Sequence, residues 1–254
     1  MKKTKLILRS MVIATCLVGI TLLSGCKKDN EPDIITLLVE QKSLYSEDEY
    51  QIEATSTSKI VYSSDSEYIA SVSERGLVTA KHIGQTNIIL TNGEDSKRLE
   101  ITVVPKSNLY PEPDVYFGES KQSIIAKFGK PDNETDEGVG YIDYSNAAPF
   151  IMYMFDDYNK LNGYSIMVKS IYSSLLTDFL LERYQPVTES GGAMMFVNEY
   201  EPNKVTKSIA LSLYNINYWM VMYLPYNTKS SQLKSGKIII DTSVFDILFK
   251  QINP

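Results

Sequence analysis

Cysteine, histidine and tryptophan are scarce: the chain of 254 residues contains two, one and one of them, respectively. Both cysteines, Cys16 and Cys26, lie near the amino terminus, so the remaining chain has no residues for a disulfide, a thiolate metal site or a thiol nucleophile. His82 has no second histidine or cysteine with which to hold a metal, and it stands beside a predicted turn. We therefore expect a fold held together by burial alone, with no bound metal or cofactor.

An excess of positive charge and long hydrophobic runs are also lacking. Lysine and arginine total 25 against 31 acidic residues, which argues against nucleic acid because nucleic acid binds basic surfaces. The main apolar stretch covers residues 11–23, which is shorter than the roughly 20 residues that cross a bilayer. Neither a nucleic-acid partner nor a spanning helix is expected.

The amino-terminal sequence is typical of a secretory leader. Cations at positions 2, 3, 5 and 9 precede the apolar stretch, and Leu23-Ser24-Gly25-Cys26 resembles a bacterial lipobox. The resemblance implies a lipoprotein signal peptide over residues 1–25, lipid attachment at Cys26 and a lipidated tether over residues 26–33. Because Lys27 replaces the aspartate associated with inner-membrane retention, we predict an outer-membrane lipoprotein. The charged run after Cys26 resembles the tethers of lipoproteins exposed on the cell surface.

Residues 34–104 are predicted to form short strands. Apolar and polar residues alternate at 50–54 and 99–103, and Asn92-Gly93 and Arg75-Gly76 are turn signals. Strands separated by turns every 8–12 residues or so indicate a small all-β sandwich.

The same stretch resembles the bacterial Ig-like group 2 (BIG2) family. Tyr62 precedes two serines where the family has an aromatic residue, and residues 70–72 and 76–80 match its Ala-x-Val and Gly-Leu-Val-x-Ala patterns. Gly84 then opens the next strand. The resemblance implies an Ig-like sandwich that acts as a spacer or adhesive unit. Its small inward side chains would be Ala70, Val72, Val78 and Ala80.

Residues 105–115 contain three prolines and are predicted to link this domain to a second one at 116–254. Ser120 is placed to cap a short helix that Gly129 and Pro131 end. The apolar side of that helix would carry Ile124, Ile125 and Phe128. Ser174 is placed to cap a second helix that Pro186 ends.

The second domain has the pattern of one unit used twice. A shift of 55 or 56 residues superimposes the two helices and also three strand-like stretches. Those stretches are 141–144, 150–155 and 164–168, matched to 196–199, 209–213 and 219–223. The repeats span residues 117–169 and 173–225, followed by a carboxy-terminal extension at 226–254. The predicted fold class is two domains, an all-β Ig-like sandwich and then an α+β tandem αβββ repeat with an antiparallel sheet.

The first helix segment is similar to that of the β-lactamase-inhibitor-protein-like (BLIP-like) and BamE-like folds. Their pattern G-x-S/T-x-x-x-V-x-x-x-x-G-x-P is matched at Gly118, Ser120, Ile124, Gly129 and Pro131, with isoleucine in place of valine. The second half lacks the first glycine and the Gly-x-Pro spacing. The resemblance implies a helix that packs on a sheet, and it carries over no inhibitory residue.

One face of the predicted sheet is rich in methionine and tyrosine. Strand alternation directs Ile209, Leu211, Leu213, Trp219, Val221, Tyr223, Ile151, Tyr153 and Phe155 toward the helices. The opposite face receives Met152, Met154, Met167, Tyr214, Tyr218, Met220 and Met222. Because methionine is adaptable and both residue types favour interfaces, these seven are the predicted binding residues. The alternative is that residues 238–249 or the Ig-like domain cover this face.

Catalytic motifs are not evident. Asp132, Glu134, Asp136 and Asp143 follow the spacing of a calcium loop, but Glu137 stands where glycine is required. Phosphate-binding glycine loops and nucleophile motifs are missing, so the protein is predicted not to be an enzyme. We expect a non-catalytic envelope lipoprotein that binds a protein or envelope component through its second domain. The alternatives are a periplasm-facing outer-membrane assembly or scaffolding lipoprotein and a carbohydrate-binding or carbohydrate-active protein.

Overall fold

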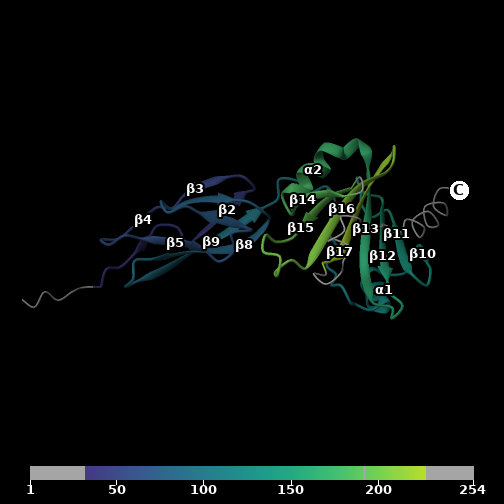
Figure 1. Cartoon of the computed structure of the whole chain (residues 1–254), viewed down its shortest axis with the longest axis horizontal. Helices are drawn as coiled ribbons and strands as arrows, with labels where there is room; N and C mark the ends of the chain where they lie inside the picture. The colour runs from purple at the N-terminus through teal and green to yellow at the C-terminus, as the bar shows by residue number, and fades with distance from the viewer. Residues whose placement is uncertain (1–31, 191–192, 227–254) are drawn as a thin grey trace, which may run out of the picture. The chain divides into compact units, whose positions relative to one another are not determined.

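The computed structural model of the chain describes residues 32–190 and 193–226 (Figure 1). Cys26 with its lipobox, and the extension from residue 227 onward, lie outside the described residues. The described part is mostly β-sheet, and from Asp33 onward it belongs to one compact unit. Within it, no helix is long and apolar enough to cross a membrane.

The first half of the described chain consists of short strands separated by turns. They are β1 (Thr36–Leu37), β2 (Gln41–Tyr45), β3 (Glu49–Gln51), β4 (Ala54–Thr55), β5 (Val61–Ser64), β6 (Ala70–Val72), β7 (Leu77–Ala80), β8 (Gly84–Thr91) and β9 (Ser96–Val104). One sheet has the order β2-β9-β8-β5, with β2 parallel to β9, and another has the order β3-β7-β6. β1 pairs with β4. Their apolar side chains form a shared core, as expected for an Ig-like sandwich.

The small residues that were expected to face inward lie in this core. Ala70 and Val78 are fully buried, Ala80 is buried, and Val72 packs against them. Gly76, in the turn before β7, has a φ of 78°, which strains any residue with a side chain. A Cβ atom at Gly76 would also lie 2.9 Å from the ring of Tyr62. The aromatic residue and the glycine of the family pattern are therefore neighbours in the fold.

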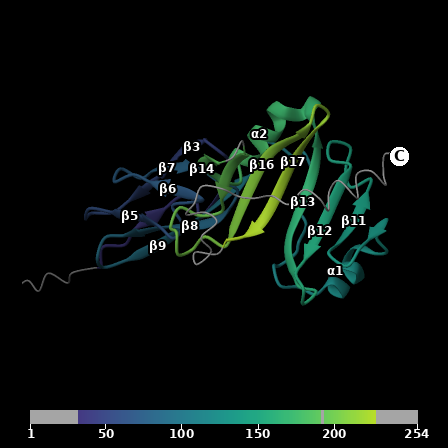
Figure 2. The ribbon, with the colours of Figure 1, turned by 45° about the vertical axis from the view of Figure 1, so that its right-hand side comes forward.

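The second half of the described chain forms one antiparallel sheet of eight strands. The strands are β10 (Asn133–Glu134), β11 (Gly138–Ile142), β12 (Phe150–Phe155), β13 (Leu161–Lys169), β14 (Gln185–Ser190), β15 (Ala193–Val197), β16 (Lys207–Asn215) and β17 (Tyr218–Pro225). Their order is β10-β11-β12-β13-β17-β16-β15-β14 (Figure 2). Helix α1 (Lys121–Phe128) precedes the first four strands, and α2 (Ser173–Leu181) precedes the last four. Each half thus has one strand, β10 or β14, more than the sequence indicated.

Helix α1 begins and ends where its sequence predicts. The Ser120 side chain accepts a hydrogen bond from the Ser123 amide at 3.1 Å, which satisfies one of the free donors of the first turn. Gly129, at φ 89°, ends the helix, and its amide donates to the Ile125 carbonyl. Ile124 is fully buried against the sheet.

Helix α2 differs from its prediction at both ends. A 3₁₀ turn at Ser170–Tyr172 runs directly into the helix, so Ser174 lies inside the first turn and the N-cap is Tyr172, without a side-chain hydrogen bond. The helix ends at Leu181, well before Pro186, which instead lies in β14. Its buried residues are Leu176, Phe179 and Leu180.

The two faces of the sheet carry separate apolar clusters. Both helices contribute to the larger one, which contains the predicted inward residues Ile151, Tyr153, Phe155, Ile209, Leu211, Val221 and Tyr223, with Trp219 at its edge. Leu213 was also expected there, and that expectation is wrong because its side chain is 57% exposed. Leu213 still pairs with Trp219 in the regular register, but the pairing shifts directly after it, so Leu213 stands at the end of the regular part of β16 and remains exposed.

Candidate binding face and domain junction

The structure brings all seven predicted binding residues into one apolar cluster on the sheet face opposite the helices. Met152, Met167, Met220 and Met222 are only 2–5% exposed. Met154, Tyr214 and Tyr218 are half-buried at its edge. We call this surface the methionine face. Its role in binding stays a prediction, since burial alone identifies no partner.

Methionines alternate with small residues across the methionine face. Direct cross-strand pairs join six positions into one row: Gly140, Met152, Ser165, Met222, Ala210 and Met195. Ser165 stands near the middle of this row, is 1% exposed, and its hydroxyl has no hydrogen-bond partner among the described residues. Leaving a buried hydroxyl unpaired is unfavourable, so the face holds a polar group whose hydrogen bonding is incomplete.

Sequence reasoning missed four members of the methionine face: Phe150, Met195, Ala210 and Leu224. Phe150 and Leu224 stand two positions from predicted members on the same strands, so a longer alternation would have found them. Ala210 follows from the same alternation, because it lies between Ile209 and Leu211, whereas Met195 requires the pairing of β15 with β16, which the sequence pattern does not specify. Among the described residues, every apolar member of the cluster belongs to the sheet itself.

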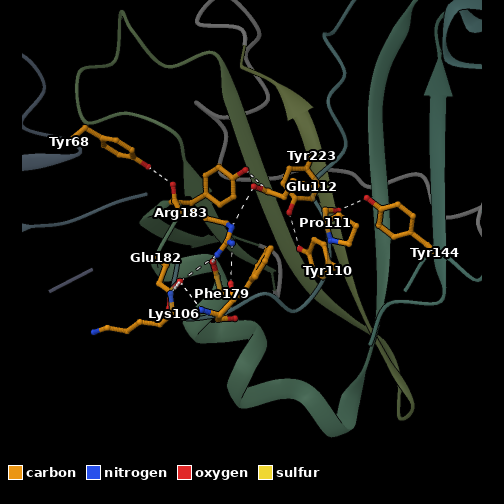
Figure 3. A network of polar contacts seen from close by, with 12 residues as sticks. Tyr68, Lys106, Tyr110, Pro111, Glu112, Tyr144, Phe179, Glu182, Arg183 and Tyr223 are labelled. Carbon is orange, nitrogen blue, oxygen red and sulfur yellow. Dashed lines mark hydrogen bonds and ion pairs between the residues drawn. The ribbon is translucent and has the colours of Figure 1, made fainter. Parts of the chain in front are cut away.

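The opposite face contains buried tyrosines that contact one another through hydrogen bonds and ring stacking (Figure 3). The rings of Tyr164 and Tyr223 stack with centroids 4.5 Å apart, and the hydroxyls of Tyr223 and Tyr110 are 2.8 Å apart. Tyr184 donates a hydrogen bond to Glu112 at 2.6 Å. Burial, followed by the charge of Glu112, raises the pKa of Tyr184 and Tyr223 well above the usual value. These tyrosines therefore stay neutral and act as structural donors rather than as bases.

Residues 105–115, predicted to be a linker, are bound to the second sheet region. Tyr110 is 4% exposed and lies in the core beside Phe179, with ring centroids 4.4 Å apart. The amides of Lys106 and Ser107 both donate to the Glu182 carboxylate, at 3.0 and 3.2 Å. The segment connects two regions of the chain, but these contacts fix its path.

An aromatic cluster joins the Ig-like region to the second region. The rings of Tyr68 and His82 stack at 4.0 Å with an interplanar angle of 8°, and Tyr200 meets both edge-on. The Tyr68 hydroxyl donates to the Arg183 carbonyl at 2.8 Å (Figure 3). The Val197 carbonyl lies 3.2 Å from the same hydroxyl. We call this cluster, together with the contacts of Glu182 and Arg183, the junction.

Glu182 and Arg183 complete the junction from the end of α2. The Glu182 carbonyl accepts a hydrogen bond from the Ile83 amide at 2.8 Å. Arg183 lies over the Phe179 ring, 3.7 Å from its centroid, and donates to the Ser107 carbonyl. Its guanidinium also pairs with the carboxylates of Glu112 and Glu182, each at 3.6 Å. The junction therefore combines ring stacking, backbone hydrogen bonds and charge.

His82 is part of the junction and has the contacts of a structural residue. It is 6% exposed, and its Nδ1 lies 2.8 Å from the Tyr68 carbonyl, to which a protonated Nδ1 donates. Burial lowers the pKa of His82 below its usual value, so the neutral ring is favoured. Within the described residues, no three histidine, cysteine or acidic side chains gather in a way that would hold a metal ion.

Comparisons with solved structures give only distant similarity. Domains 4–9 of the surface layer protein SbsC match with 12% identity and a TM-score of 0.28, over 79% of this chain and 28% of that one. Domains 5–6 of the S-layer protein SbsC match with 12% identity and a TM-score of 0.26, over 78% and 86%. The C-terminal domain of TagH matches with 11% identity and a TM-score of 0.26, over 66% and 98%. The chain thus spans less than a third of the first structure, and scores this low carry no argument about fold or function.

Sequence comparison identifies the first region alone. No curated protein is a significant match to the chain. The family model of the bacterial Ig-like domain (group 2) matches residues 31–103, which include strands β1 to β8 and nearly all of β9. The sandwich, its small inward residues and the contact of Tyr62 with Gly76 agree with that match. Residues 31–103 are therefore a bacterial Ig-like domain of group 2.

Proposed function

We propose that the chain is a non-catalytic lipoprotein of the outer membrane that is anchored at Cys26 and exposed at the cell surface. In this proposal the second domain binds a protein or another envelope component through the methionine face. The Ig-like domain serves as the spacer between the anchor and the binding domain. The lipobox and the charged tether of the sequence support the anchor.

The observation that carries the proposal is the methionine face itself. A sheet that helices cover on one side is expected to be polar on the other, yet here the other side carries a second apolar cluster. Flexible thioethers adapt to partners of different shape.

The arrangement of the second domain supports a resemblance to the BLIP-like and BamE-like folds. One helix followed by strands occurs twice, and the matched positions of the first helix have the roles that the pattern requires: cap, buried contact and end. We infer a tandem α+β repeat whose methionine face is the contact surface. The inference rests on pattern and topology.

The junction supports the spacer role of the Ig-like domain. Tyr68, His82 and Ile83 of that domain contact Glu182, Arg183 and Tyr200 of the second domain. Such contacts hold the binding domain in a set direction relative to the spacer. A spacer that is joined in this way presents the methionine face more reproducibly than a free linker does.

The binding role is tested by co-purification from envelopes with two matched double variants. Met154→Ser with Tyr218→Ser changes half-buried members of the methionine face. Met194→Ser with Tyr158→Ser changes the same residue types at positions 46% and 84% exposed. We expect the first variant to lose the partner and the second to retain it. Equal recovery with both variants would contradict the role of the face.

Exposure at the cell surface is tested separately, by protease treatment of intact cells. The proposal predicts that the full-length protein disappears while a periplasmic control survives. Survival of the full-length protein, with an outward-facing control degraded, would instead support the periplasm-facing scaffolding role.

A further inference from the structure

The methionine face is buried without a cover from the described chain. Four of its methionines are 2–5% exposed, although all apolar members of the cluster among the described residues belong to the sheet. The described residues therefore supply no apolar layer over this face, and the chain outside the described residues is the nearest source of one.

The chain that follows β17 begins at the centre of this sheet. β17 ends at Pro225 between β13 and β16, and its residues Met220, Met222 and Leu224 belong to the methionine face. Residues 227–237 are a polar stretch that contains Gly236. Eleven residues reach at most roughly 36–40 Å, whereas the six strands of the central row span about 24 Å. The polar stretch is therefore long enough to bring the following residues over any part of the face.

The sequence after that stretch has the composition of a buried segment. Nine of the fifteen residues from 238 to 252 are large and apolar: Ile238, Ile239, Ile240, Val244, Phe245, Ile247, Leu248, Phe249 and Ile252. An exposed segment of this composition would be an aggregation hazard. Its length is too short to cross a bilayer. An apolar surface on the same chain is its natural contact.

We propose that residues 238–252 dock on the methionine face of their own chain and cover it. The methionine side chains adapt to the bulky isoleucine, leucine and phenylalanine residues of the segment. The spacer of residues 227–237 keeps the segment at a high effective concentration near the face. One consequence rests on the proposed function. A partner of the methionine face then competes with this segment, so the segment sets how readily the face binds that partner.

The test is the oxidation of individual methionines by hydrogen peroxide in the purified full chain, followed by mass spectrometry. Oxidation follows exposure, so Met194, at 46% exposed, serves as the internal reference. The variant carries Ile239→Ser, Phe245→Ser and Leu248→Ser. The control carries Lys237→Ser, directly before the segment, together with Asp241→Ser and Lys250→Ser within it. Fluorescence of Trp219, on the helix side of the sheet, reports whether the fold is intact.

We expect Met152, Met167, Met220 and Met222 to oxidise at least about tenfold faster in the variant, because loss of the cover raises the open population. Met194 and the control should be unchanged. Unchanged protection in a folded variant would overturn the proposal. Protection that depends on protein concentration would overturn it in favour of a second copy as the cover. If Trp219 shows that the variant is unfolded, a labelled synthetic peptide of residues 236–253 must bind the unaltered chain in exchange for the segment, and no binding counts against the proposal. None of these readouts requires the partner of the proposed function.

Discussion

Gly76 of the Ig-like domain is constrained both by its backbone conformation and by a neighbouring side chain. Its φ of 78° strains residues with a side chain, and the Tyr62 ring occupies the space where a Cβ would stand. Gly93 has a similarly positive φ of 93°, but nothing lies within 4 Å of its Cβ position. Comparing alanine substitutions at Gly76 and Gly93 therefore separates the cost of backbone strain from the cost of steric contact.

We predict that Gly93→Ala lowers the free energy of unfolding by about 1 kcal/mol. Gly76→Ala should lower it by about 2–3 kcal/mol, because the ring of Tyr62 must also move. Urea unfolding of both variants measures the difference. Equal losses of unfolding free energy in the two variants would show that the contact with Tyr62 does not contribute to the cost of Gly76→Ala.

Single residues also show where sequence reasoning succeeds. Ala70 and Val78 were placed inward correctly because strand alternation assigns a face to every residue. Met152 and Met222 were placed on one face for the same reason. The roles of Tyr68 and His82 in the junction could not be predicted, since the residues of the second region that they contact are more than 100 positions away in sequence.

The elements of the second region were predictable where local signals set their ends. Helix α1 has a capping serine and a terminal glycine, and its predicted limits are confirmed. Helix α2 starts from a 3₁₀ turn and ends without a glycine, so no local signal marks it. Strands β10 and β14 were not predicted. β10 has only two residues, and β14 begins at a proline-containing stretch.

The junction between elements should respond to pH through His82. Burial lowers the pKa of His82, the nearby Lys81 lowers it further, and the Tyr68 carbonyl and Glu199 raise it. Tyr68 and Tyr200 supply the neutral surroundings. The unfolded chain thus binds a proton at His82 more readily than the folded chain does. The stability from the neutral ring is present above the usual histidine pKa of about 6.5 and is lost as the pH falls below it.

We predict that the unaltered chain loses more stability than His82→Gln does when the pH falls from about 7.5 to about 5. Glutamine does not titrate, so subtracting the two pH dependences removes the contribution of the carboxylates. Urea unfolding at both pH values gives the comparison. Parallel losses in the two proteins would contradict the assigned environment of His82.

At the scale of the whole molecule, the junction should couple the Ig-like domain and the second region in unfolding. Calorimetry of the unaltered protein is expected to show one cooperative transition, with equal calorimetric and van't Hoff enthalpies. Tyr68→Ala with His82→Ala removes the stacked rings and should split or broaden that transition. Tyr45→Ala, at a position 49% exposed in β2, is the control and should leave one transition. Two transitions in the unaltered protein would contradict the coupling.

The central claim is that the protein acts by contact through the methionine face. The most direct measurement is photo-crosslinking in living cells with a photoreactive residue at position 218, on this face, or at position 158, in the turn after β12, where Tyr158 is 84% exposed. The account predicts that position 218 gives one discrete crosslinked envelope component and that position 158 does not. No crosslink at position 218, or the same products from both positions, would contradict it.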